Sequence, residues 1–142
     1  MKKLFKTILI FNLLINLSFS ELVLIVHKDF PIEKISPKLL KKIYANKIKI
    51  WPHGGSIIRT VLRKGKTHKS FCKVLNQTPS YLKRFWKKQV FTGRGPSLKR
   101  FISAQDLIIY ISTHKNAIGY ADSSINNKLI KKITLKIYKG KK

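Results

Sequence analysis

Residues 92–120 read TGRGPSLKRFISAQDLIIYISTHKNAIGY. The stretch opens with an arginine between two glycines, passes through a segment with the apolar stripe of a helix, and closes with a small apolar strand that contains a glycine. Segments of this kind, each next to an amphipathic helix, are typical of α/β lobes that bind ligands. We therefore predict an α/β fold in which a mixed sheet is flanked by helices.

Strand signals occur on both sides of this stretch. Apolar and β-branched runs predict strands at residues 22–27, 57–63, 117–121 and 133–138. The first of these strands should be buried on both faces, because its apolar residues are continuous. The last alternates apolar and polar residues and is predicted to be an edge strand.

Four helices are predicted, three of them from their start signals. A hydroxyl residue followed by proline marks two starts, at Ser36 and Thr78, since the hydroxyl can cap the helix and proline fits its first turn. Ser103 and Asp106 resemble a capping box at a third start. The remaining helix follows the turn at residues 63–67.

Residues 1–20 have the layout of a secretory signal. Three lysines within residues 1–6 precede an apolar run over residues 7–17, and Ser18-Phe19-Ser20 then places small residues where a signal peptidase cleaves. The apolar run is shorter than the roughly 20 residues that a membrane-spanning helix needs, which argues against the alternative of a transmembrane anchor. We predict cleavage before Glu21 and a periplasmic or secreted protein.

The rest of the chain is predicted to form one domain, residues 21–138, followed by a basic tail at residues 139–142. A domain of this size buries about two-thirds of its unfolded surface and can hold a core of its own. Cys72 is the only cysteine, so no internal disulfide can form. Its apolar helical neighbours predict a buried, inert thiol.

Net charge is the other strong signal. The chain has 31 Lys and Arg residues against five Asp and Glu, a formal net charge of +26. The electrostatic field of such a charge attracts anions of any kind, including phosphate, nucleic acid and acidic lipid head groups. Because the cations are spread along the chain, the charge sets a preference for anionic partners without identifying one.

The order of short motifs from residue 22 to residue 121 resembles that of the phosphate-type periplasmic substrate-binding proteins, specifically their small stand-alone members. Each motif is short, but the ordered set is fairly specific. The matching segments are the opening strand, Ser36-Pro37, Tyr44-Ala45-Asn46-Lys47, Trp51-Pro52-His53-Gly54-Gly55, residues 63–71, Phe85-Trp86, Phe91-Thr92-Gly93-Arg94-Gly95 and Asn116-Ala117-Ile118-Gly119-Tyr120.

The resemblance implies a type II periplasmic-binding fold, in which two α/β lobes of full-sized relatives close on an oxyanion. This chain matches the second lobe alone, as a single periplasmic-binding-protein-like domain. In that lobe the family carries an arginine followed closely by a Gly-Ser-Gly-Thr turn at a helix start. Arg63 matches the arginine, Gly65 a glycine and Thr67 the closing threonine. Lys64 and Lys66 depart from the pattern, since full-length binders carry small or acidic residues there.

Two parts of the full-sized binding site have no counterpart in this sequence. They are the donors of the first lobe and the carboxylate that helps full-length binders select protonated phosphate. A single copy is therefore not expected to capture phosphate with high affinity.

The turn at residues 63–67 is a candidate anion site on physical grounds alone. Unpaired N–H groups and the positive dipole end of a helix attract anions, and an arginine fork and a hydroxyl add charge-assisted bonds to phosphate oxygens. We expect Arg63, Gly65, Lys66 and Thr67 to cradle the anion. The alternative is a Lys/Gly surface turn in which Thr67 only caps the helix.

Arg94 is the fifth candidate anion-binding residue. It lies between two glycines, where the backbone can approach a ligand closely. The flanking glycines place it as a secondary contact at the mouth of the lobe. The alternative is an ordinary glycine-rich helix exit.

Aromatic residues and a strand glycine are interpreted as structural. Trp51, Trp86, Phe85 and Tyr81 have the spacing of core residues and are predicted to be core rather than stacking platforms. Gly119 within a strand predicts close packing or a bend.

No pattern of catalytic or metal-ligating residues is apparent. The four histidines are scattered without Cys, Asp or Glu at ligand spacing, so neither a metal site nor a cofactor is expected. No Ser/His/Asp or Cys/His arrangement is apparent in the sequence, and the five acids form no obvious pair for acid–base chemistry. We expect a protein that is not an enzyme.

The leading hypothesis is an exported, non-catalytic binding module for phosphate or a similar oxyanion, linked to phosphate transport or sensing through an ABC-transporter membrane subunit. The alternative is a basic polyanion-binding or envelope scaffold protein that keeps the lobe without a small ligand. A third possibility is that two copies pair, each offering half a pocket. The export signal argues against an intracellular nucleic-acid role but leaves extracellular DNA open.

Overall fold

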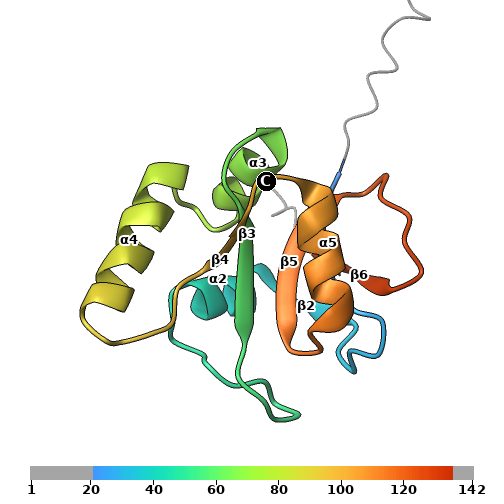
Figure 1. Ribbon diagram of the computed structural model, residues 1–142, viewed down its shortest axis with the longest axis horizontal. Coiled ribbons are helices and arrows are strands. Elements are labelled where there is room, and N and C mark those ends of the chain that lie inside the picture. Colours follow the sequence, from blue (N-terminus) through green and yellow to red (C-terminus); the bar gives the residue numbers. More distant parts are fainter. Residues whose placement is uncertain (1–20, 136–142) are drawn as a thin grey trace, which may run out of the picture.

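The computed structural model describes residues 21–135. The predicted signal, the end of the last predicted strand (136–138) and the basic tail lie outside the described residues. The strands are β1 (Leu22–His27), β2 (Lys34–Ile35), β3 (Ile58–Leu62), β4 (Lys99–Phe101), β5 (Ala117–Asp122) and β6 (Ile130–Leu135). The helices are α2 (Pro37–Tyr44), α3 (Lys66–Val74), α4 (Pro79–Phe91) and α5 (Ala104–Thr113) (Figure 1).

The six strands form one mixed sheet in the order β2-β6-β1-β5-β3-β4. β1 is antiparallel to both of its neighbours, β6 and β5, whereas β3 runs parallel to β5 and β4. The predicted α/β class and mixed sheet are therefore confirmed. Among the described helices, none is long and apolar enough to cross a bilayer.

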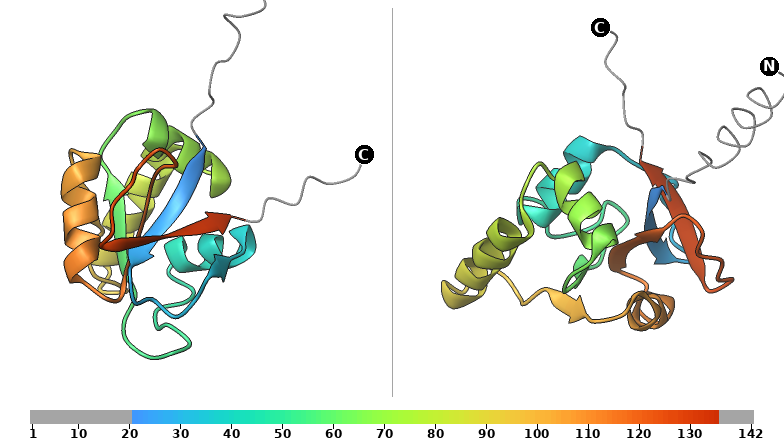
Figure 2. Two further views of the ribbon diagram at one scale, coloured as in Figure 1. Left: turned by 90° about the vertical axis from the view of Figure 1, so that its right-hand side faces the viewer. Right: turned by 90° about the horizontal axis from the view of Figure 1, so that it is seen from above.

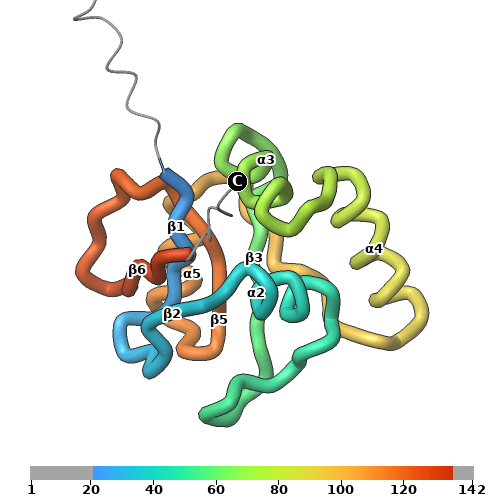
Figure 3. Tube along the Cα trace, turned by 180° about the vertical axis from the view of Figure 1, so that it is seen from behind, coloured from blue at the N-terminus to red at the C-terminus, as the bar shows by residue number. Residues whose placement is uncertain are grey.

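Helices cover both faces of this sheet (Figures 2 and 3). A side chain at Gly119 of β5 would run into Ile111 of α5, whereas the next residue, Tyr120, stacks on Phe71 of α3. Because successive strand residues point to opposite faces, α5 covers one face and α3 the other. α2 lies on the α3 side, since Tyr44 packs edge-on against Phe71.

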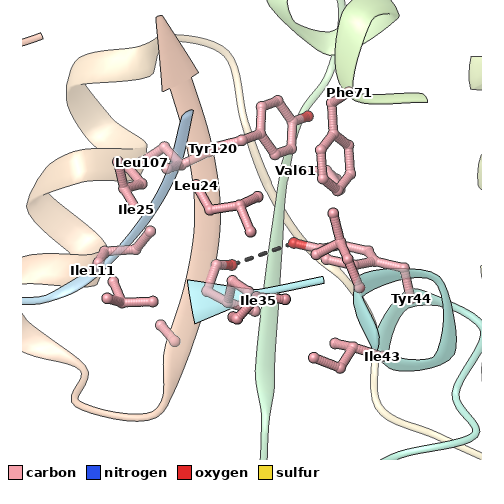
Figure 4. Packing of buried hydrophobic residues seen from close by; sticks show 14 of the residues in the cluster. Leu24, Ile25, Ile35, Ile43, Tyr44, Val61, Phe71, Leu107, Ile111 and Tyr120 are labelled. Atoms are coloured by element: carbon pink, nitrogen blue, oxygen red, sulfur yellow. Dashed lines mark hydrogen bonds between the residues drawn. The ribbon is translucent and has the colours of Figure 1, made fainter. Parts of the chain in front are cut away.

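Three aromatic rings form the centre of the core on the α2 and α3 side (Figure 4). The ring centroids of Phe71 and Tyr120 lie 3.9 Å apart, and those of Tyr44 and Phe71 lie 4.8 Å apart. The Tyr44 hydroxyl donates to the Thr60 carbonyl oxygen at 2.9 Å. This bond ties α2 to β3, the strand that leads to the candidate site.

Gly119 allows β5 to pack closely against its surroundings, as predicted from its place within a strand. An added Cβ would collide with Thr60 Oγ1, Ile111 and Leu107. The Thr60 hydroxyl instead donates to the Ile118 carbonyl oxygen at 2.8 Å. The close packing fixes β3 against β5 and α5.

The three predicted helix starts are confirmed. Side-chain oxygens of Ser36, Thr78 and Ser103 each accept a bond from the N–H three residues on, at 3.1 Å in every case. These signals are local, so the sequence alone is enough to find them.

The prediction of an edge strand at residues 133–138 is wrong. β6 spans Ile130–Leu135 and lies inside the sheet, between β1 and β2. The outer neighbour β2 has only two residues, and a segment so short has no periodicity from which a strand could be predicted. The three-residue strand β4 was missed for the same reason.

Of the four aromatic residues predicted to be core, Trp51 and Trp86 are buried and Phe85 is half-buried. The prediction is wrong for Tyr81, which is 48% exposed on the outer side of α4. Cys72 is fully buried, and burial raises its pKa to about 11. The prediction of a buried thiol is therefore confirmed, and its inertness stays a prediction.

Candidate functional site

The candidate site is the turn between β3 and α3. Residues 63–66 are exposed and Thr67 is half-buried. The Arg63 N–H donates to the Phe101 carbonyl oxygen of β4 at 2.9 Å, which fixes the start of the turn against the sheet. The first hydrogen bond of the helix follows, from Lys69 N–H to the Gly65 carbonyl oxygen. The turn thus presents its side chains to solvent from a fixed backbone.

The N-terminus of α3 differs from those of the other described helices. Its N-cap is Gly65, with φ 107° and no side-chain oxygen to accept from the first turn. The positive φ explains the glycine, because L side chains rarely adopt this conformation. α2, α4 and α5 each have a serine or threonine cap. The first N–H groups of α3, at the positive end of its dipole, therefore lack a side-chain acceptor.

Thr67 does not cap the helix. It is the second residue of α3, because the N-cap is Gly65. Its hydroxyl therefore lies in the first turn with the unpaired N–H groups. The alternative interpretation, a surface turn in which Thr67 only caps the helix, therefore does not agree with the position of Thr67 in α3.

A buried hydrogen-bond network lies directly below the turn. The Tyr120 hydroxyl accepts from the Leu62 N–H at 2.8 Å and is hydrogen-bonded to His68 Nδ1. His68 is the third residue of α3, and its Nε2 lies 3.7 Å from Cys72 Sγ. Tyr120 thereby holds both the end of β3 and the first turn of α3, which makes it a positioning residue for the site.

The network favours a neutral imidazole. Burial, and secondarily the positive charge of Arg100, lower the pKa of His68 from its ordinary value of 6.5. The Tyr120 hydroxyl can then donate to Nδ1, with the ring proton on Nε2 toward Cys72. Burial also raises the pKa of Tyr120, so its hydroxyl stays protonated as this arrangement requires.

Sequence reasoning missed both positioning residues. His68 and Tyr120 lie 52 positions apart, and no local signal connects them. The only relevant signal was the Ala-Ile-Gly-Tyr strand itself. Its glycine predicted close packing in this strand, but it did not indicate which residue contacts Tyr120.

The structure does not bring Arg94 together with the turn. The Arg94 carbonyl oxygen accepts from Lys49 Nζ and from Asn46 Nδ2, both at 3.0 Å. Lys49 belongs to the segment that leads into β3, since its carbonyl oxygen accepts from Ile57 N–H. Arg94 thus lies at the beginning of β3, whereas Arg63 follows its end. The other four candidate residues are contiguous.

The described residues hold no set of three or more His, Cys, Asp or Glu side chains that could ligate a metal ion. The site is therefore built from main-chain N–H groups, cations and one hydroxyl. These are the groups that bind oxyanions in proteins.

The family described as "PBP superfamily domain" matches residues 14–141 of the sequence. Several solved structures share the fold, among them the following two. One, from Clostridium perfringens, is named as a phosphate ABC transporter substrate-binding protein with bound phosphate, at 18% identity and a TM-score of 0.64. The other, from Vibrio cholerae, is an ABC-type phosphate transport receptor, at 15% identity and a TM-score of 0.64.

Each of these matches covers 80% of this chain but only 44% and 46%, respectively, of the solved chain. The chain therefore spans less than half the length of these structural neighbours. No curated protein matches the sequence.

Proposed function

Because this chain belongs to the PBP superfamily, we propose that it is a non-catalytic binding module for phosphate or a similar oxyanion. The observation that carries the proposal is the uncapped N-terminus of α3, next to an exposed arginine. A solved structure of the same fold is named for its bound phosphate. An oxyanion at the turn would complete the one described helix start that lacks a side-chain cap.

Each residue of the turn has a separate role in the proposal. Gly65 lets the backbone take the conformation that exposes the N–H groups of Lys66 and Thr67. Arg63 supplies a planar fork that matches two phosphate oxygens. The Thr67 hydroxyl donates one further bond, and the Lys66 ammonium adds charge at close range.

The proposal includes the setting in which the module works. The signal predicted in residues 1–20 would export the chain, so the site would meet its anion in the periplasm or outside the cell. We assign the module to phosphate transport or sensing, with an ABC-transporter membrane subunit as its partner. Since the chain spans less than half of its structural neighbours, a second copy is the other candidate to complete the pocket.

Calorimetric titration of the purified protein with phosphate tests the site. Arg63→Ala should weaken binding by about tenfold to a hundredfold, as expected for the loss of charge-assisted bonds. Lys115→Ala is the matched control, because it removes the same charge at an exposed position near the other end of β3. Arg94→Ala should leave the affinity within about twofold.

Equal binding by the wild-type protein and Arg63→Ala would rule out the turn as the site. The absence of heat from both would reject phosphate as the ligand. Equal losses in Arg63→Ala and Lys115→Ala would indicate general charge attraction in place of a built pocket.

A further inference from the structure

The positive charge is unevenly distributed over the fold. Residues 34–105 contain 19 Lys and Arg residues and no Asp or Glu. This segment includes α2, β3, α3, α4 and β4, which form the left-hand and central part of the molecule in Figure 1. It also includes the two-residue strand β2, which lies at the opposite edge of the sheet from β4. All five acids lie before or after it, beside β1 and β6, in α5 and at the end of β5. The part of the fold formed by α2, β3, α3, α4 and β4, here named the cationic half, therefore contains Lys and Arg but no Asp or Glu.

Two cavities meet on the outer side of this cationic half. The first, about 570 Å³, lies between the end of α2 and the start of α4. The second, about 450 Å³, follows the exposed face of α4. Both are lined by Tyr81 and Arg84, so they form one continuous depression, here named the α2–α4 groove. Its cations are Lys41, Lys42, Lys47, Arg84, Lys88 and Arg94.

Aromatic rings lie among these cations. Tyr81 and Phe85, one helical turn apart, have centroids 6.4 Å apart and ring planes 17° from parallel. Tyr81 is 48% exposed although it is large and mostly apolar. Arg84 and Lys88, also one turn apart, lie beside them on the same helix face. The groove thus alternates flat apolar surfaces with positive charges.

A polar side chain lines the first cavity. Gln77 has a buried Oε1 without a hydrogen-bond partner among the described residues. A carboxamide can pair with the donor and acceptor edge of a nucleobase. A phosphodiester of the nucleic-acid backbone presents only acceptors and could not satisfy this oxygen.

We propose that the α2–α4 groove binds single-stranded nucleic acid. Its phosphates would lie on the six cations, and its bases would stack on Tyr81 and Phe85. Cationic grooves with exposed aromatic rings bind single strands in this way, because every base has a flat face and unpaired bases can leave the strand. A duplex would keep its bases from the rings. The groove does not include Arg63, so this inference does not rest on the proposed phosphate site.

Fluorescence anisotropy with a labelled oligothymidylate of about 12 nucleotides tests the proposal, since single-strand sites span roughly 4 to 16 nucleotides. The double variant Arg84→Ala/Lys88→Ala should bind at least about tenfold more weakly. Lys28→Ala/Lys128→Ala removes the same charge from exposed positions outside the groove and should change the affinity by less than about twofold. Arg63→Ala should bind the oligonucleotide as the wild type does.

Tyr81→Ala separates base stacking from charge attraction. It should weaken oligothymidylate binding by about fivefold or more and leave the binding of linear polyphosphate unchanged. The affinity for the oligonucleotide should fall with salt, with a slope in log–log form approaching about −4 for six phosphate contacts.

Two results would overturn the proposal. One is an equal loss in the two double variants, which would mean that the whole cationic surface attracts the strand. The other is that polyphosphate binds as tightly as the oligonucleotide and that Tyr81→Ala changes neither affinity. This result would show that the bases do not contribute to binding.

Discussion

At the scale of single residues, the candidate site depends on side chains that no ligand would touch. The Tyr120 hydroxyl is hydrogen-bonded to both the Leu62 N–H and His68, and it thereby joins the end of β3 to the first turn of α3. The network favours a neutral imidazole, because burial and the charge of Arg100 lower the pKa of His68 and only an unprotonated Nδ1 can accept from the hydroxyl. The geometry of the turn is thereby linked to the titration of one histidine.

Acidification should therefore destabilise the fold through His68. Its folded pKa lies below the ordinary value of 6.5, so the unfolded chain binds the proton more tightly. Its contribution to stability is complete above about pH 6.5 and is lost as the pH falls from there toward the folded pKa. Urea unfolding at about pH 7.5 and about pH 5.5 should show a lower midpoint at the acid pH.

The variant His68→Asn isolates this contribution. Its side-chain oxygen can accept from Tyr120 in place of Nδ1, but it does not titrate, so the difference between the two midpoints should shrink. His53→Asn is the matched control at an exposed histidine and should keep the wild-type difference. If His68→Asn also keeps the full difference, the acid sensitivity arises elsewhere.

The residues of the site differ in how well the sequence predicts them. The caps at Ser36, Thr78 and Ser103 depend on neighbours three positions away, so their signals are local. Tyr120 acts on partners more than 50 positions away, and its role exists only after β3 and β5 have paired. The exposure of Tyr81 depends equally on what packs against α4, so helical spacing alone led to a wrong assignment to the core.

At the scale of elements, a buried arginine joins β3 to α2 and α4. Arg59 donates from Nε to the Ile43 carbonyl oxygen and from an Nη to the Ile48 carbonyl oxygen, both at 2.6 Å. Its guanidinium lies 5.0 Å from the centre of the Trp86 ring. It thus binds a carbonyl in the last turn of α2, where a helix end favours a cation.

Replacing Arg59 by methionine should loosen this junction. The side chain keeps much of its apolar length, but two carbonyl oxygens lose their donor, which should cost about 2–4 kcal/mol in the free energy of unfolding. Arg84→Met, at an exposed position on α4, should change it by less than about 0.5 kcal/mol. Urea unfolding of the two variants measures the difference. Equal stability would show that Arg59 is not needed at the junction.

The main elements were predictable from the sequence, because strands of five or six residues and amphipathic helices carry their own periodicity. The order of the strands in the sheet could not be predicted from the sequence. The sequence of β6 is typical of an edge strand, but in the fold the two-residue strand β2 pairs with its outer side. A segment as short as β2 has no pattern from which this pairing could be predicted. Sheet order depends on such contacts, which the fold creates.

At the scale of the whole molecule, the sequence gives the net charge but not its arrangement. Only the fold shows that α2, β3, α3, α4 and β4, which belong to the acid-free residues 34–105, lie together, whereas β2 of the same segment lies at the opposite edge of the sheet. Both proposed sites lie in this cationic half, the turn at the N-terminus of α3 and the groove along α4. The cations of these two sites repel one another, so this repulsion should destabilise the native state at low ionic strength.

Salt should therefore stabilise this protein. Raising sodium chloride from about 0.01 M to about 0.15 M shortens the screening length from about 30 Å to about 8 Å, which weakens repulsion within the cationic half. The melting temperature should rise across this range, measured by circular dichroism. A melting temperature that stays constant or falls as salt rises would mean that the cations are too far apart in the folded state for their repulsion to destabilise it.

Phosphate adds a second effect that can be separated from screening. At matched ionic strength, an anion that binds the native turn stabilises it by mass action, in proportion to the logarithm of its concentration above the Kd. Phosphate should then raise the melting temperature of the wild type above its value in chloride, whereas Arg63→Ala should keep the response to chloride and lose the excess. A variant that retains the excess would place the bound phosphate elsewhere in the cationic half, and the uncapped helix would then be an exposed end without a ligand.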